Sequence, residues 1–327
     1  MKNAEYEIVN QFSLDNLANS EYHNSVDYQG YISSSQLKDY AKSPRYALYQ
    51  REHPEEQNED SAALRFGTLF HDCMYILALG GDIDTWRSQL EVFDPPINER
   101  TGQPYGVTTK AYSSALAEFT LMNAEKSIVT AQERDDVIAM IKSLVYSDSE
   151  TSSLVRRLLH WGKPETSHFV DFGNNIKFKV RPDLETRLKI IDWKTTNLET
   201  FDEDSINRAI IRYGYHISAA MYQWVVYKMT GKWKTFYLVM VSKTPPYDAV
   251  IVCMDGYTYK YDEDMDYLWK GVGAKEFERL RDLHAECVID NNYPTAEVFV
   301  KRGEDNLPII NIKPPIYLEQ KYNDTDE

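Results

Sequence analysis

The amino-acid sequence predicts a mixed α/β fold of the α+β type, with a central mixed β-sheet and flanking helices. Two observations predict it. Helical periodicity dominates the chain up to about residue 146, and strand-like alternation replaces it between residues 168 and 193. Because helices come first and a β-β-β-α-β-β-α order follows, we expect an N-terminal helical region joined to a sheet that carries helices on its faces.

The first 30 residues are polar and carry no sustained period, so we expect them to form a loosely held arm. A short helix should follow, because Ser33 and Gln36, three residues later, have the pattern of a capping box. Ser43-Pro44 predicts a break before a second short helix that runs through Tyr49.

Residues 61–79 predict a strongly apolar helix. Residues 80–109 are rich in proline, glycine and turn residues, which predicts an irregular excursion. Helical periodicity returns over residues 111–124 and again over residues 131–146, the latter preceded by the capping residue Thr130.

Three short strands are expected next, over residues 168–172, 176–181 and 188–193. The turn Gly173-Asn174-Asn175 separates the first two, and a polar turn at 184–188 precedes the third. Their order along the chain predicts a meander of three strands.

The remaining elements alternate between helix and strand. We expect a long helix over 204–230 that ends at Gly231, strands over 235–241 and 249–254, a charged helix over 259–290, and an extended or irregular tail over 291–327.

The composition is that of a globular protein, with 43% hydrophobic and 27% charged residues among 327. No apolar run is long enough to span a membrane, and the start of the sequence has no signal-peptide core. We therefore expect no membrane partner and a location in the cytoplasm.

The net charge of −15 argues against a nonspecific nucleic-acid coat protein. It leaves room for an enzyme that holds DNA in a local basic channel with divalent cations. Cys73, Cys253 and Cys287 fit no zinc or iron–sulfur spacing, so we expect them to be core thiols in a reducing compartment.

Charged residues in the third expected strand need an explanation. Asp192 and Lys194 share a strand face with Ile190, because alternate side chains point the same way. Two charges on a face that is partly apolar require partners or a function, since unpaired burial is costly. An ordinary salt bridge, or an edge strand with one wet face, is the plain structural alternative.

Asp183, Asp192 and Lys194 together are suited to binding a metal ion beside a phosphate. Two carboxylates on neighbouring strand positions can share Mg²⁺ beside a phosphate, and the ion lowers the pKa of a bound water. Lys194 could orient or help deprotonate that water. The backbone carbonyl of Trp193 lies between the two side chains and is a further candidate ligand.

Pro182-Asp183, eight intervening residues and Asp192-Trp193-Lys194 resemble the signature of the PD-(D/E)XK nuclease superfamily. Gly67-Thr-Leu-Phe-His71 looks like the Gly-x-x-x-His element of the RecB-like branch, which implies that His71 is an imidazole ligand of the same metal. Gln223-Trp-Val-Val-Tyr227 looks like its Gln-x-x-x-Tyr element. The order of these elements along the chain matches that branch.

Further segments are similar to RecE-type exonucleases (exonuclease VIII), which are related in role to lambda exonuclease. These segments are Tyr31 to Lys38, Phe66 to His71, Val180 to Asp183, Asp192 to Thr196 and Tyr213 to Tyr222. The resemblance covers roughly residues 30 to 290.

The resemblance implies a restriction-endonuclease-like core and a Mg²⁺-dependent 5′→3′ exonuclease of phage or prophage type, with Mn²⁺ as a possible substitute. Such enzymes degrade one strand of linear double-stranded DNA and leave a 3′ single strand for recombination by an annealing protein. They form ring-shaped homo-oligomers and act in a bacterial or phage-infected cell.

On this basis we expect three parts of the chain. Residues 1–30 form a flexible arm, residues 31–290 the nuclease domain, and residues 291–327 the tail. Within the domain we expect a helical part over 31–160 and a catalytic α/β core over 161–290.

Several candidates have ordinary structural alternatives. His71 lies on an apolar helix where a hydrogen-bonded core histidine is common, and Gln223 and Tyr227 share a helix face that could simply be an interface. Glu165 could reach the metal through water or lie on the surface. Arg181 could contact phosphate or form a structural ion pair.

Hydroxyl residues near the expected site are the last candidates. Ser33 and Ser35 stand at a helix start, where they could bind a terminal phosphate or simply cap the helix. Thr195 closes the third strand and could position Lys194 or a phosphate.

Two other functions fit the same residues. The core would also support a structure-specific or restriction-type endonuclease. A non-catalytic DNA-binding module on a nuclease fold is the second alternative, although loss of a ligand or of the lysine would be expected there.

Overall fold

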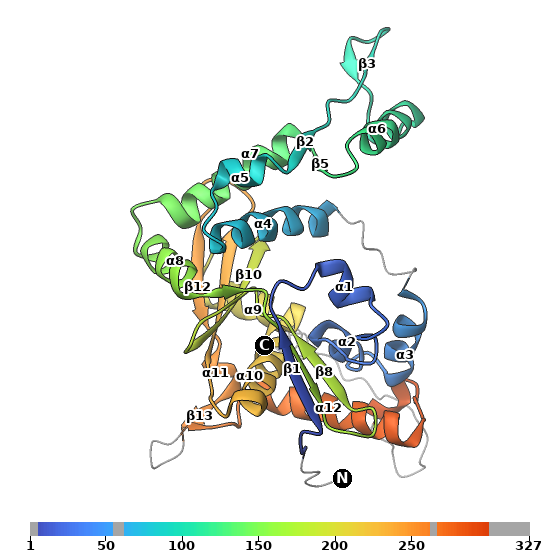
Figure 1. Ribbon diagram of the computed structural model, residues 1–327, viewed down its shortest axis with the longest axis vertical. Coiled ribbons are helices and arrows are strands. Elements are labelled where there is room, and N and C mark those ends of the chain that lie inside the picture. Colours follow the sequence, from blue (N-terminus) through green and yellow to red (C-terminus); the bar gives the residue numbers. More distant parts are fainter. Residues whose placement is uncertain (1–5, 55–61, 262–266, 301–327) are drawn as a thin grey trace, which may run out of the picture.

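The computed structural model describes residues 6–54, 62–261 and 267–300 of the chain. Two sheets and the helices around them form the body of the molecule, and an excursion of small elements projects from one end (Figure 1). Within the described ranges, no helix combines the length and apolar character needed to cross a membrane.

The larger sheet is mixed, as the sequence predicts. Its five strands lie in the order β12-β11-β10-β9-β6. They are β6 (Lys163–Pro164), β9 (Leu184–Glu185), β10 (Lys189–Thr196), β11 (Thr235–Ser242) and β12 (Ala249–Cys253). The pair β10 and β11 is parallel, and the other pairs are antiparallel.

The smaller sheet is antiparallel and corrects the expected meander. It contains β1 (Asn10–Leu14), β7 (Ser167–Asp171) and β8 (Lys177–Val180), in the order β1-β7-β8. The first two expected strands pair as a hairpin, but the third, β10, belongs to the larger sheet. Pro182 offers no N–H for a ladder, so the chain leaves the small sheet after β8 and enters the large sheet at β9.

The expected polar turn is also shorter than predicted. Leu184 and Glu185 form β9 and are buried, so the turn before β10 comprises residues 186–188. Glu185 tolerates burial because its carboxylate lies 2.6 Å from His168 Nε2 and 2.5 Å from Lys234 Nζ.

Helices cover both faces of the larger sheet. One apolar cluster joins the sheet to α2 (Ser34–Asp39), α3 (Pro44–Glu52), α10 (Tyr215–Thr230) and α12 (Val272–Asp290). The other joins it to α4 (Ala62–Ala78), α7 (Ala131–Ile141), a π-helical turn (Lys142–Tyr146) and α8 (Glu150–Trp161). The structure confirms the helices expected at 61–79 and 131–146, whereas α8 had no counterpart in the sequence prediction.

The long helix expected over 204–230 is two helices. Gly214 separates α9 (Glu203–Tyr213) from α10, and its φ of +65° lies in the left-handed region that glycine adopts without a steric penalty. The chain therefore turns between α9 and α10.

The charged helix expected over 259–290 begins later. It is preceded by α11 (Asp255–Thr258), β13 (Lys260–Tyr261) and β14 (Tyr267–Leu268), and α12 starts only at Val272. Gly271 passes so close to the chain that a Cβ there would lie 2.2 Å from the carbonyl oxygen of Tyr257. This close approach fixes the start of α12.

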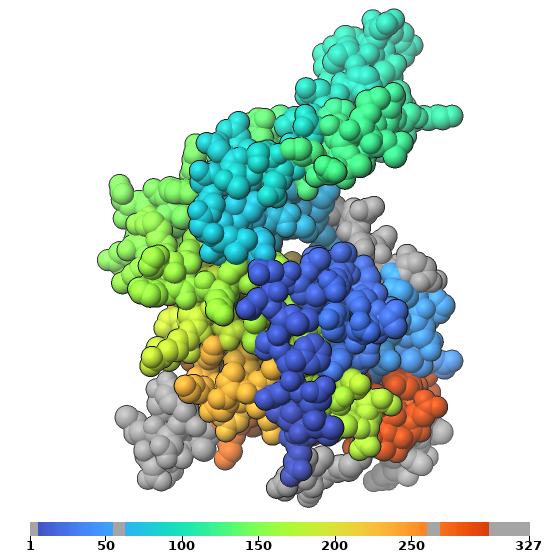
Figure 2. All heavy atoms as spheres, in the orientation of Figure 1, coloured from blue at the N-terminus to red at the C-terminus, as the bar shows by residue number. Residues whose placement is uncertain are grey.

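The projecting excursion corresponds to the irregular segment expected after residue 80 and to the helix expected at 111–124 (Figure 2). Its elements are α5 (Ile83–Arg87), β2 (Leu90–Val92), β3 (Ile97–Asn98), β4 (Gln103–Pro104), α6 (Lys110–Met122) and β5 (Ser127–Val129). The parallel pair β2 and β5 connects it to the body.

The N-terminal segment differs from the expected loose arm. Strand β1 pairs with β7, and α1 (Asn19–Asn24) follows it across the front of the molecule (Figure 2). Phe12, Tyr22 and Tyr31 pack around the buried Phe169, which anchors this segment. At the other end, a 3-10 turn (Ala296–Phe299) is described, and the rest of the expected tail lies outside the described residues.

All three cysteines are free thiols. Cys73 and Cys287 are buried, as expected, but Cys253 is exposed because it ends β12, an edge strand of the larger sheet.

Candidate active site

Strand β10 places Asp192 and Lys194 by its alternation. Ile191 and Trp193 face the cluster that contains α4, and Ile190 faces the cluster that contains α10. Asp192 and Lys194 share the face of Ile190. Lys194 Nζ lies 2.6 Å from Asp192 Oδ2 and donates a hydrogen bond of 3.2 Å to the Trp193 carbonyl oxygen. The two charges therefore compensate each other.

Asp183 stands where the chain passes from β8 to β9. Its Oδ2 accepts a hydrogen bond of 2.6 Å from the backbone N–H of Trp193. The antiparallel pairing of Leu184 with Ile191 brings the two segments together. The structure thus places Asp183 beside the strand that carries Asp192 and Lys194, as the sequence predicts.

Helix α4 brings His71 to the same place. Phe70, Cys73 and Met74 on this helix are buried in the core, whereas His71 lies beside Asp183, with Nδ1 3.4 Å from Asp183 Oδ1. Gly67 lies one turn earlier, where a Cβ would be 3.8 Å from Thr195 Oγ1. Helix α4 and the end of β10 are therefore in close approach.

The electrostatics of the site separate the two carboxylates. Burial alone raises the pKa of both, but the charge and hydrogen bond of His71, with Lys194, hold the pKa of Asp183 below its ordinary value. The pKa of Asp192 is raised, because burial and the Asp183 charge outweigh Lys194. Burial lowers the pKa of Lys194, yet Asp192 and Asp183 more than offset this and raise it. Lys194 accordingly keeps its proton at neutral pH.

A cavity of about 850 Å³ opens at these residues. His71, Asp183 and Lys194 line it, together with the predicted candidates Ser33, Ser35, Glu165, Arg181 and Thr195. Three of the residues that line the cavity are basic (Arg181, Lys194, Lys243) and three are acidic (Asp72, Glu165, Asp183). The lining therefore has no excess of acidic residues, whereas the whole chain has a net charge of −15. This balance makes the cavity a better place for a polyanion than the average surface.

Arg181 and Glu165 face each other across the cavity wall. Arg181 Nη1 is 3.7 Å from Glu165 Oε2, and Arg181 Nε donates a hydrogen bond of 2.8 Å to Ser167 Oγ. Burial raises the pKa of Glu165 despite the attraction of Arg181. The ion pair named as the structural alternative for Arg181 is present, although it is longer than a hydrogen bond.

Ser33 caps α2, as the sequence predicts. Its side chain accepts from the N–H of Gln36, whose side chain accepts in turn from the N–H of Ser33. Ser33 Oγ also lies 2.9 Å from Ser35 Oγ. Both serines line the cavity while the capping hydrogen bonds are made.

The structure does not bring Gln223 and Tyr227 into the cavity. Gln223 is fully buried, and its Nε2 donates to the Lys234 carbonyl oxygen at 2.8 Å and to Asp255 Oδ1 at 2.9 Å. Tyr227 stacks on Trp233, with ring centroids 4.0 Å apart. The contacts of these two residues are the structural ones named as their alternative.

Tyrosines of the same helix occupy the cavity wall instead. Tyr215 and Tyr222 line the cavity, and Tyr222 Oη donates a hydrogen bond of 3.2 Å to the Arg181 carbonyl oxygen. Their separation of seven residues places them on one helix face, so the helical period was a signal that could have identified them.

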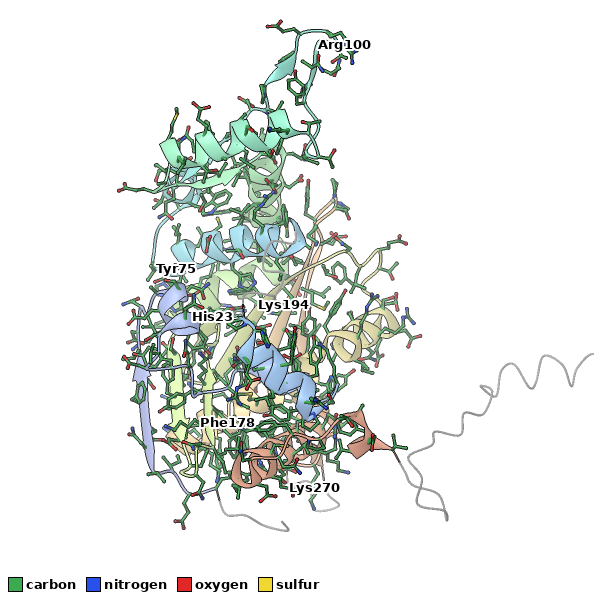
Figure 3. The ribbon with its side chains drawn as sticks, turned by 90° about the vertical axis from the view of Figure 1, so that its right-hand side faces the viewer. His23, Tyr75, Arg100, Phe178, Lys194 and Lys270 are labelled. Atoms are coloured by element: carbon green, nitrogen blue, oxygen red, sulfur yellow. The ribbon has the colours of Figure 1, made fainter. Side chains whose placement is uncertain are left out.

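Residues of the N-terminal segment also contribute, and sequence reasoning missed them. Tyr22 and His23 line the cavity from α1, and Tyr75 lines it from α4. Figure 3 shows His23 and Tyr75 on the side of the molecule where Lys194 lies. No local sequence pattern predicts that Tyr22 and His23 line the cavity, because their position depends on how the N-terminal segment packs on the small sheet.

The donor chemistry fits a hard divalent cation. Asp183 and Asp192 offer carboxylate oxygens, Trp193 offers a carbonyl oxygen, and His71 offers an imidazole next to Asp183. In the part of the chain that the structure describes, no three such side chains already meet as a metal site. Asp192 would exchange its contact with Lys194 for the cation.

Comparison with known proteins adds the family. The family described as PDDEXK-like domain of unknown function (DUF3799) matches residues 33–272. A solved structure from Eubacterium rectale, described as a putative exonuclease, is 14% identical, with a TM-score of 0.44 over 93% of this chain and 97% of that chain. No curated protein matches the chain. The family match includes His71, Asp183, Asp192 and Lys194, and it begins after Tyr22 and His23.

Proposed function

This chain belongs to the family of PDDEXK-like domains, and we propose that it is a metal-dependent deoxyribonuclease acting on linear double-stranded DNA. One observation carries the proposal: His71, Asp183 and Lys194 line one cavity, and Asp192 pairs with Lys194 at its wall. This is the set of groups that phosphodiester hydrolysis needs.

Each group has a role in the proposed reaction. Asp183 and Asp192 would hold Mg²⁺, with the Trp193 carbonyl oxygen and His71 as further ligands, and Mn²⁺ could replace it. When bound, the ion would supply positive charge and lower the pKa of a coordinated water. Lys194 lines the cavity beside these carboxylates, so we assign to it hydrogen-bond donation to a phosphate oxygen and stabilisation of the charge that develops there.

We further propose a RecE-type exonuclease that proceeds 5′→3′ and leaves a 3′ single strand for an annealing protein in recombination. The similarity of Phe66 to His71, Val180 to Asp183 and Asp192 to Thr196 to those enzymes supports this. The chain would then act as a ring-shaped homo-oligomer, since a clamp would keep it on the DNA.

The test is digestion of linear duplex labelled at either the 5′ or the 3′ end, with covalently closed circles in the same reaction and Mg²⁺ present. We expect early release of the 5′ label, intact circles, and no digestion in excess EDTA. Cleaved circles would establish the endonuclease alternative. Duplex binding without any cleavage would establish a DNA-binding module.

A lysine pair provides the matched control. Lys194→Ala should lower the rate by roughly 10²- to 10³-fold, because it removes a donor that acts on the developing charge. Lys270→Ala should leave the rate unchanged, since Lys270 is exposed and lies far from Lys194 (Figure 3). Equal rates for the Lys194→Ala protein and the parent would refute the catalytic assignment.

A further inference from the structure

We propose that Arg181 forms the centre of a phosphate-binding subsite in the wall of the cavity, completed by the N-terminal segment. The phosphate belongs to the bound nucleic-acid strand, and this identification of the ligand rests on the proposed nuclease function. The subsite itself follows from unsatisfied donors, from the aromatic support of the guanidinium, and from a loosely held competing carboxylate.

The donors are two guanidinium nitrogens. The Arg181 side chain is 8% exposed and lines the cavity, and Nε is satisfied by Ser167. Nη1 and Nη2 are buried and have no hydrogen-bond partner among the described residues. Buried, unpaired donors of a charged group are costly, so a ligand that accepts from both of them stabilises the complex.

Tyr22 fixes the orientation of this guanidinium. The Arg181 Cζ atom lies 4.0 Å from the centroid of the Tyr22 ring, and Lys179 Nζ lies 4.6 Å from the same centroid. Lys179 is held by a hydrogen bond of 2.7 Å to the Tyr22 carbonyl oxygen. Because the ring covers a face of the guanidinium, the in-plane N–H groups remain for a ligand.

The charges around Arg181 favour an anion. Lys179 lies two residues earlier on β8, and His23 lies beside Tyr22, with a pKa lowered by burial and by the charges of Lys179 and Arg181. Glu165 is the acidic side chain within 4 Å among the described residues, and its 3.7 Å distance to Nη1 exceeds a hydrogen bond. Positive charge is therefore only partly compensated here.

Phosphate fits these donors better than the carboxylate that is present. A guanidinium binds phosphate through two parallel N–H···O bonds, which would satisfy Nη1 and Nη2 together. Both nitrogens are shielded from solvent, so we expect Glu165, the neighbouring acid, to turn away when a phosphate takes its place. Arg181 precedes Asp183 by two residues, so the subsite adjoins the proposed site of cleavage.

Two variants should change the affinity for phosphate in opposite directions. Both are measured in metal-free protein with EDTA, where no hydrolysis takes place. Titration with inorganic phosphate, followed by calorimetry, should show binding that Glu165→Gln strengthens several-fold, because a competing negative charge is removed. Arg181→Lys should weaken binding by about tenfold or more, since a single ammonium cannot make the bidentate contact. Arg279→Lys, on α12 and paired with Glu276, is the matched control and should bind like the parent.

Single-stranded oligonucleotides with a 5′-phosphate, a 3′-phosphate or two hydroxyl ends identify the source of the phosphate. A gain in the Glu165→Gln protein that depends on one end phosphate assigns the subsite to that end, and an equal gain for all three assigns it to an internal phosphodiester.

Two results would overturn the proposal: unchanged phosphate affinity in Glu165→Gln, or parent-like affinity in folded Arg181→Lys. Because Glu165→Gln tests a gain of binding, misfolding of the arginine variant does not prevent the test. Phosphate binding with this variant pattern in a protein that fails to cleave DNA would retain the subsite and reject the nuclease function.

Discussion

Charged residues at the site are held in three pairs, and two of these pairs join different segments. Asp192 contacts Lys194 on its own strand, Asp183 contacts His71 from α4, and Arg181 lies near Glu165. Each pairing lowers the cost of placing charge in a partly buried wall. A metal ion or a phosphate would replace these contacts by stronger ones, so the pairs keep the site assembled before ligands bind.

Gln223 illustrates a polar residue with a structural role. Gln223→Ala removes hydrogen bonds to the Lys234 carbonyl oxygen and to Asp255. We expect a loss of about 1–3 kcal/mol in the free energy of unfolding, because buried acceptors lose their donor. Chemical denaturation measures this loss, and the rate of linear-duplex digestion below the transition should stay at the parent value.

A glutamine on the surface is the control for that experiment. Gln132→Ala removes an exposed hydrogen bond to Asp136 and should change stability by less than about 0.5 kcal/mol. Normal stability of Gln223→Ala combined with lost activity would instead return Gln223 to the catalytic site.

At the scale of elements, α10 presents different chemistry on neighbouring faces. Tyr215 and Tyr222 contribute to the cavity wall, whereas Trp224 and Val225 are buried in the core. Gly214 sets where this helix begins, and a Cβ there would lie 2.8 Å from Lys38 Cδ. The break at Gly214 is therefore what positions Tyr215 in the cavity wall.

The packing of α12 on α2 and α3 should make stability depend on pH. His284 of α12 is 2% exposed, with Nδ1 2.9 Å from Tyr40 Oη, and burial together with the charge of Arg51 lowers its pKa to about 3. Below pH 6.5 the unfolded chain binds a proton that the folded chain does not, so stability falls as the pH falls from 6.5 towards 3.

The variant His284→Gln isolates this contribution, because it keeps a polar side chain and removes the titration. Between pH 6.5 and about pH 5, we expect the parent to lose about 1.5 kcal/mol more than the variant. Urea unfolding at both pH values measures the difference, and parallel losses in the two proteins would show that His284 is not responsible.

At the scale of the whole molecule, the N-terminal segment contributes to the cavity, whereas the excursion contributes its first and last strands to the core. The segment with β1 and α1 pairs with the small sheet and supplies Tyr22 and His23 to the cavity. The excursion joins the body through β2 and β5, and Leu90 and Val129 of those strands belong to the core.

The excursion should be dispensable for folding. Helix α6 has no buried residue, so replacing residues 95–125 by about eight Gly and Ser residues removes little core. We expect one cooperative thermal transition and a Tm within about 2 °C of the parent, which corresponds to a loss of roughly 1 kcal/mol. Calorimetry tests this, and a broad or absent transition would show that the excursion is part of the core.

Periodicity and capping patterns were sufficient to predict the positions of several site residues. The period of two along β10 predicts that Asp192 and Lys194 share a face, and the capping pattern of Ser33 and Gln36 predicts the start of α2. The apolar period of residues 61–79 predicts α4. Such features could be predicted because the causes act over a few residues.

The spacing of residues along a helix did not predict which helix face lines the cavity. Gln223 and Tyr227 share a face, as predicted, but the sequence alone did not say whether that face meets the cavity or the core. Similarly, alternation predicts the strands over residues 168–193, whereas the change of sheet at Pro182 decides their partners.

The sequence by itself determined helices such as α4 and α7, the strands β10 and β11, the family resemblance and the grouping of Asp183, Asp192 and Lys194. The tertiary structure decided that His71 contacts Asp183, that Tyr22 supports Arg181, and that Gln223 is buried away from the cavity. The physical reason is range. Periodicity and capping arise within one element, whereas these contacts join residues between 112 and 159 positions apart, or depend on which face of a helix packs.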